Sequence, residues 1–196
     1  MITKFYLSFI VSLFIVVFSG EVLGQCTVCD HVVGATGNPL PAIPGGANGI
    51  TVCITANRTN VIEFNNAQNV TICIAEGVTL NANFNSLSSL SQLNNYGSFT
   101  ARADYNGDWT INNFGSMSVN FGSLNSNKTI NNSGTFNRTG SFTISGTFNS
   151  TGIASVSAGF TVNGGGQVNN SGTLSVGGSY QNNGQTNSSN GTINVA

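Results

Sequence analysis

Acidic and aromatic side chains come together at one place in the chain, the segment from Asp104 to Trp109. Oxygen-bearing side chains at alternate positions are typical of the start of a calcium loop. Here the glycine is misplaced, and the twelfth position is Gly115, where such a loop has a bidentate glutamate. The rings of Tyr105 and Trp109 could instead stack on a sugar. A solvated turn whose rings pack against neighbouring residues is the simplest interpretation.

The other ionisable side chains do not group into a catalytic site. No Asp, Glu, Lys, Arg or His occurs between residues 139 and 196, so that stretch has no conventional general acid or base. The acids available to a site are scattered along the sequence: Glu63, Glu76, Asp104 and Asp108. We therefore expect a protein that is not an enzyme and that needs no cofactor.

Four cysteines, Cys26, Cys29, Cys53 and Cys73, suit two disulfides in an exported protein, with three alternative pairings. The neighbours of Cys53 and Cys73 are apolar, so we expect the two cysteines to point together to the opposite face of their strands. They then bond either to each other or to Cys26 and Cys29. A zinc site is the alternative, but it needs two close pairs of cysteines and only Cys26-x-x-Cys29 is one.

The first 24 residues have the order of a secretory signal peptide: a positive charge at Lys4, an apolar run over residues 5–18 and a small, polar stretch over residues 19–24. A run of 14 residues is short for a membrane-spanning helix, which needs about 20. A lipoprotein signal ending at Cys26 is disfavoured because Gln25 is a poor residue before the modified cysteine. We expect cleavage after Gly24, export, and no membrane attachment afterwards.

The composition excludes several classes of function. Only 6% of the residues are charged, against about 25% in an ordinary soluble domain. Half of the chain consists of 30 Asn, 23 Ser, 20 Thr and 25 Gly. A net charge of −1 provides no basic surface for a nucleic acid. The apolar content of 39% with little charge favours a folded chain over a disordered one.

A phrase of the type Asn-Asn-x-Gly recurs six times, twice with serine in place of one or both asparagines. Its glycines are 18 to 20 residues apart: Gly97, Gly115, Gly134, Gly152, Gly172 and Gly191. We attribute the Asn and Gly to corners, since both tolerate the left-handed backbone conformation. Stacked asparagines can also hydrogen-bond to one another from repeat to repeat. Six copies with so little drift indicate a repeat architecture.

Polar and apolar residues alternate after each glycine, which predicts a β-strand with one buried face. The inward columns are Phe99, Met117, Phe136, Ala154, Leu174 and Ile193, and Ala101, Val119, Arg138, Val156, Val176 and Val195. The outward columns contain three candidate ligand contacts, Thr100, Thr135 and Thr173. A buried unpaired charge is costly, so we expect a bulge or an outward swing at Arg138.

A second strand precedes each corner. Its inward residues are Leu93, Ile111, Ile130, Phe148 and Val168, beside Gln92, Thr110, Thr129, Thr147, Gln167 and Thr186. Rungs of about 19 residues stacked at about 4.8 Å predict an all-β, right-handed parallel β-helix, or β-solenoid. We expect seven to eight rungs over residues 49–196, after an N-terminal cap over residues 25–48. A disordered, Asn-rich tail is disfavoured because low complexity alone would not keep alternate positions apolar.

The rung pattern resembles the right-handed β-helix regions of secreted bacterial surface proteins of the adhesin and haemagglutinin-like group. That resemblance implies display at the cell surface and contact with glycans or other cells. A structural or adhesive module is therefore the first functional hypothesis. Ice binding through the Ser and Thr columns is the second, although Ile153 interrupts one column. The last strand has an open edge, so we expect either continuation in a longer chain or edge-to-edge self-association.

Overall fold

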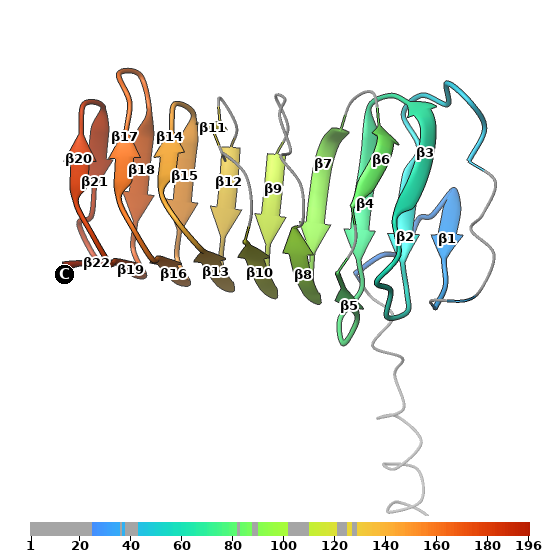
Figure 1. The fold of residues 1–196 in the computed structure, drawn as a ribbon, viewed down its shortest axis with the longest axis horizontal. Coiled ribbons are helices and arrows are strands. Elements are labelled where there is room, and N and C mark those ends of the chain that lie inside the picture. The colour runs from blue at the N-terminus through green and yellow to red at the C-terminus, as the bar shows by residue number, and fades with distance from the viewer. Residues whose placement is uncertain are drawn as a thin grey trace, which may run out of the picture.

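A computed structural model describes residues 25–35, 37, 43–81, 83–87, 90–101, 110–120, 125–126 and 129–196. The predicted signal peptide and the segment from Asp104 to Trp109 lie outside these residues. In the described part the fold is all-β, and every strand pairing is parallel. Among these residues there is no helix that is long and apolar enough to cross a membrane. The predicted fold class is confirmed: a β-solenoid of about 7 turns (Figure 1).

Three sheets form the sides of the solenoid, and a two-stranded sheet pairs β3 (Ile62–Ala67) with β6 (Phe84–Leu87). The nine-stranded sheet contains, in order, β1 (His31–Val33), β2 (Thr51–Ile54), β4 (Val70–Ile74), β7 (Leu90–Asn95), β9 (Thr110–Asn113), β12 (Thr129–Asn132), β15 (Thr147–Ser150), β18 (Gln167–Asn170) and β21 (Gln185–Asn187). The seven-stranded sheet contains β22 (Thr192–Val195), β19 (Thr173–Val176), β16 (Ile153–Val156), β13 (Thr135–Arg138), β10 (Ser116–Val119), β8 (Ser98–Ala101) and β5 (Thr79–Leu80). The four-stranded sheet contains β11 (Asn125–Ser126), β14 (Phe142–Ile144), β17 (Phe160–Val162) and β20 (Tyr180–Asn182).

Equivalent residues of successive rungs pair with each other, as the repeat predicts. Met117 of β10, for example, lies between Phe99 of β8 and Phe136 of β13. The inward columns fill one continuous core, in which Phe136, Phe142 and Phe148 pack their rings at centroid separations of 5.6 to 5.8 Å. The predicted alternation is confirmed in β8, β10, β13, β16 and β19, each of which buries its inward residues. In the last strand, β22, Ile193 is only partly buried and Val195, which was predicted to point inward, is 51% exposed, because no further rung covers it.

Arg138 differs from the prediction. It keeps its place in the inward column, paired in register with Val119 and Val156, and it is buried without a bulge or an outward swing. Its Nε donates to the backbone oxygen of Ser141 at 2.9 Å, and a terminal guanidinium nitrogen donates to that of Val119 at 3.2 Å. The prediction was wrong because backbone carbonyls at the end of the strand satisfy the guanidinium inside the solenoid.

The repeat glycines do not adopt the left-handed backbone conformation that was predicted for them, and they recur for a different reason. The positive-φ residues include Gly77, Gly140 and Gly165 but none of the six repeat glycines. A Cβ atom on Gly134 would overlap the carbonyl oxygen of Gly115 in the rung below, and Gly115 stands in the same relation to Gly97. Glycine is required at these corners because successive backbones approach each other closely.

One outward assignment was also wrong. In β21, Gln185 pairs with Gln167 and Thr186 pairs with Val168, so Thr186 occupies the inward column. Its hydroxyl lies 2.6 Å from the Tyr180 hydroxyl. Burial raises the pKa of Tyr180, and this hydrogen bond opposes that rise. The two side chains satisfy each other where the core becomes partly polar near its end.

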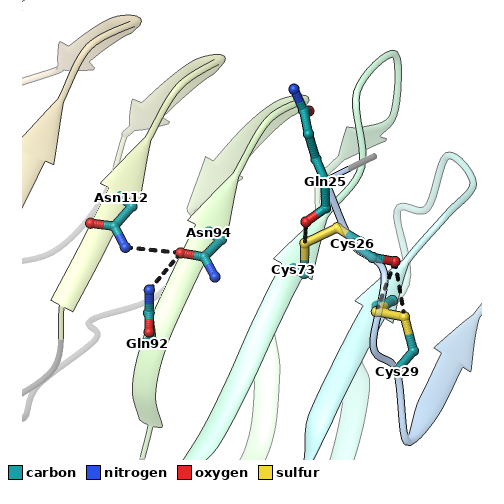
Figure 2. Close-up of a disulfide and its surroundings, with 8 residues drawn as sticks. Gln25, Cys26, Cys29, Cys73, Gln92, Asn94 and Asn112 are labelled. Carbon is teal, nitrogen blue, oxygen red and sulfur yellow. Dashed lines mark hydrogen bonds between the residues drawn. A yellow bond between two sulfur atoms is a disulfide. The ribbon is translucent and has the colours of Figure 1, made fainter. Parts of the chain in front are cut away.

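The N-terminal segment is fastened to the solenoid by two disulfides. Cys26 bonds to Cys73 and Cys29 bonds to Cys53, with Cα–Cα distances of 5.8 and 5.7 Å. Of the predicted alternatives, the structure therefore has the one in which Cys53 and Cys73 bond to Cys29 and Cys26 and not to each other. The chain then enters the nine-stranded sheet as β1, where Val32 pairs with Cys53. The segment therefore covers the outer face of β2 and β4 and also adds a strand at their edge (Figure 2).

Candidate functional site

The predicted ligand contacts lie on the outer face of the seven-stranded sheet. Thr100, Thr135 and Thr173 are partly exposed and come from β8, β13 and β19. Thr135 and Thr173 share one column and Thr100 lies in the other. Ile153 separates Thr135 from Thr173 and is 56% exposed, so this face is not continuously polar. The other two candidates, Tyr105 and Trp109, lie outside the described residues.

The outer face of the nine-stranded sheet is more regular. The first asparagine of each Asn-Asn pair points outward, and its amide nitrogen donates to the amide oxygen of its equivalent in the preceding rung. The outer ladder formed in this way joins Asn94, Asn112, Asn131, Asn149 and Asn169 with donor–acceptor distances of 2.8 to 2.9 Å. Gln92 donates to Asn94 at 2.8 Å at the start of the ladder (Figure 2).

The second residue of each pair forms a buried inner ladder. In this ladder each amide nitrogen donates to the following rung, whereas in the outer ladder it donates to the preceding one. Asn95 donates to Asn113 and Asn113 donates to Asn132, each at 2.7 Å. Each amide nitrogen also donates to a backbone oxygen that follows the corner in the next rung, as Asn113 does to Thr135 at 2.8 Å. These carbonyl contacts determine which way the amides face, so the inner ladder stabilises the corners.

Next to the outer ladder runs a second polar column. It is formed by Gln92, Thr110, Thr129, Thr147, Gln167 and Gln185, which pair strand by strand from β7 to β21. Both columns consist of uncharged amides and hydroxyls and contain no apolar interruption. We regard this two-column surface, the amide face, as the candidate binding site. The sequence predicts asparagine stacking, and the signal that locates the face is the outward position of the first asparagine in each pair.

An aromatic pair stands at the corner beside the amide face. The rings of Tyr96 and Phe114 stack with a centroid separation of 4.6 Å and an interplanar angle of 5°. Phe114 is 50% exposed. The residues at the same corner position in the next three rungs are Ser133, Thr151 and Ser171, and all are exposed. The corner therefore changes from large rings to small hydroxyl residues at one rung boundary.

A shallow groove of about 240 Å³ follows this corner toward the C-terminal end. Its lining consists of amide and hydroxyl residues together with their backbone: Asn149, Ser150, Thr151, Asn169, Asn170, Ser171, Asn187 and Ser189. It joins the outer ladder to the corner residues. The surface can therefore donate and accept hydrogen bonds along the solenoid axis without presenting a formal charge.

The predicted zinc alternative is wrong, because all four cysteines are in disulfides. Among the described residues, no group of three His, Cys, Asp or Glu side chains could hold a metal ion. The acids described are Asp30, Glu63 and Glu76, and they precede β7 in the chain. The chemistry of the amide face is thus hydrogen bonding.

Comparison with protein-family models, curated proteins and solved structures finds no match to this chain. The amide face, the aromatic corner and the disulfides are therefore the features from which function is inferred.

Proposed function

We propose that the protein is a secreted, non-catalytic structural and adhesive module that contacts glycans or other surfaces through its amide face. The observation that carries this proposal is the uninterrupted pair of uncharged polar columns from β7 to β21. A rigid ladder of this kind offers many weak hydrogen bonds in one register, which suits an extended, repetitive ligand better than a small molecule.

The chemistry of the face favours glycans among surface ligands. Asparagine and threonine side chains supply both hydrogen-bond donors and acceptors. They therefore match the hydroxyl groups of a sugar, which also donate and accept. The basic groups that would neutralise the phosphates of a nucleic acid are missing from both columns. The groove along the corner has the same uncharged lining, so it extends the surface that a sugar chain could contact.

Two features support export. Disulfides persist in oxidising compartments, and here they hold the first described residues against β2 and β4. The preceding 24 residues have the order of a signal peptide. N-terminal sequencing of the natural protein should begin after Gly24. A cytosolic protein with Met1 intact would contradict export.

A binding experiment tests the adhesive role. The purified protein should bind to a glycan array or to whole cells, and Thr129→Arg should weaken that binding because it places a long charged side chain in the middle of the amide face. Ser118→Arg makes the same change on the seven-stranded sheet and should bind like the unmodified protein. Equal loss of binding in both variants, or no binding at all, would contradict the proposal.

Ice binding remains the second candidate because Ser and Thr form paired outward columns on the seven-stranded sheet. The exposed Ile153 breaks the hydroxyl array that would order water. We therefore expect no thermal hysteresis from the purified protein. Clear hysteresis that disappears in Thr135→Tyr would favour ice binding over adhesion.

A further inference from the structure

Gln25 is the residue that the export proposed above would leave at the amino terminus. Cleavage after Gly24 frees the α-amino group of Gln25 and makes Cys26 the second residue of the chain. Because Cys26 is bonded to Cys73 of β4, the new terminus is fastened to the solenoid one residue from its end. It is therefore held on the outer face of the nine-stranded sheet (Figure 2).

This terminus lies at the start of the amide face. Cys73 pairs in register with Asn94, so it occupies the column of the outer ladder one rung before the first asparagine. Gln25 stands beside that position, and its side chain points away from Cys73 (Figure 2). A free α-amino group here is mostly protonated at neutral pH and would place a positive charge at the end of an otherwise uncharged surface.

The side-chain amide of Gln25 is free to react. Gln25 is exposed, and no residue in the described part of the chain hydrogen-bonds to its side chain. A fraction of any α-amino group is uncharged at neutral pH, and in that form it is a nucleophile. In a terminal glutamine, the α-nitrogen, Cα, Cβ, Cγ and Cδ can close an unstrained lactam ring.

We propose that Gln25 of the exported protein cyclises to pyroglutamate. The uncharged α-nitrogen attacks Cδ and forms a bond to it, the bond from Cδ to Nε2 breaks, and Nε2 leaves as ammonia with one proton from the α-amino group. The lactam has one N–H donor and one carbonyl acceptor and carries no charge. It therefore adds an uncharged amide to the end of the amide face. This inference rests on the proposed export, since cleavage after Gly24 makes Gln25 the terminal residue.

Mass spectrometry of the amino-terminal peptide of the natural protein tests the modification. We expect this peptide to begin at Gln25 and to be lighter than the unmodified peptide by the mass of one ammonia molecule. A peptide that begins at Gln25 with its amide intact, or that begins at another residue after the leader, would overturn the modification and leave export standing. A natural protein that retains Met1 would refute export and the modification together.

Gln25→Asn is the matched control. Asparagine keeps an exposed amide, but its side chain is one carbon too short to close an unstrained ring, so its α-amino group should stay free. An amine-reactive reagent, applied to the intact protein before digestion, should label the α-amino group of Gln25→Asn and not that of the natural sequence. Lys128, the one lysine after residue 24, is the internal standard for labelling. Labelling of the α-amino group in both proteins would overturn the proposal, because it would show that Gln25 remains open.

Discussion

The hydroxyl oxygen of Ser150 accepts a hydrogen bond from the amide of Asn132 at 3.1 Å, but no donor reaches the buried amide oxygen of Asn170 in the next rung. The inner ladder is interrupted there because serine is one bond too short to continue it. Every other asparagine of the ladder after Asn95 has its amide oxygen bonded by the preceding rung. An unsatisfied buried oxygen is a local cost in stability.

Ser150→Asn should therefore stabilise the protein. The new amide would donate to Asn170 and, by the pattern of the other rungs, to the backbone oxygen of Thr173, raising the free energy of unfolding by about 1 kcal/mol. Urea denaturation measures the change. Ser155→Asn, on the outer face of β16, is the control and should have little effect. A loss of stability in Ser150→Asn alone would mean that the corner has no room for the longer side chain.

Gly134→Ala should be strongly destabilising. Its Cβ would overlap the carbonyl oxygen of Gly115, and the stacked backbones cannot separate without breaking strand pairing. We expect a loss of about 3 kcal/mol or more in thermal or urea denaturation. Gly164→Ala serves as the comparison, since the nearest atom to its Cβ would be the Asn183 oxygen at 3.9 Å. Similar costs at both positions would contradict close rung contact as the reason for the repeat glycine.

The two disulfides should differ in how much they stabilise the protein, because they enclose different lengths of chain. Cys26–Cys73 spans 47 residues and Cys29–Cys53 spans 24. Removing the longer link with Cys26→Ala and Cys73→Ala should cost about 4 kcal/mol, and removing the shorter link slightly less. Peptide mapping without reduction checks the pairing directly. A peptide that links Cys53 to Cys73 would exclude the arrangement.

Arg138 should contribute to stability through hydrogen bonds from inside the core. Arg138→Ala leaves a cavity and removes the donors to Val119 and Ser141, so we expect a loss of about 2–4 kcal/mol in chemical denaturation. Arg138→Lys should recover part of the loss, because it keeps a donor but not the forked guanidinium. Asn137→Ala, on the exposed side of the same strand, should be nearly neutral. A neutral Arg138→Ala would show that these bonds do not stabilise the fold.

Local pattern predicted the repeat unit of this protein well. The spacing from Gly97 to Gly191 predicts the rung length, and the alternation around Phe99 and Phe136 predicts which side of each strand is buried. Both are properties of neighbouring residues, since side chains alternate along any strand and the same positions recur in every turn. The solenoid class follows from these two periods.

The functional face and the partners of individual groups were decided only by the tertiary structure. Cys53 reaches Cys29 because the N-terminal segment folds back over β2, and no spacing in the sequence distinguishes that pairing from the others. Arg138 stays inside because carbonyl oxygens from another rung and from the following turn reach it. Gly134 is needed because another turn passes within contact distance. Each of these outcomes depends on how far apart two turns stand in space, whereas the sequence by itself determined only the period with which the turns repeat.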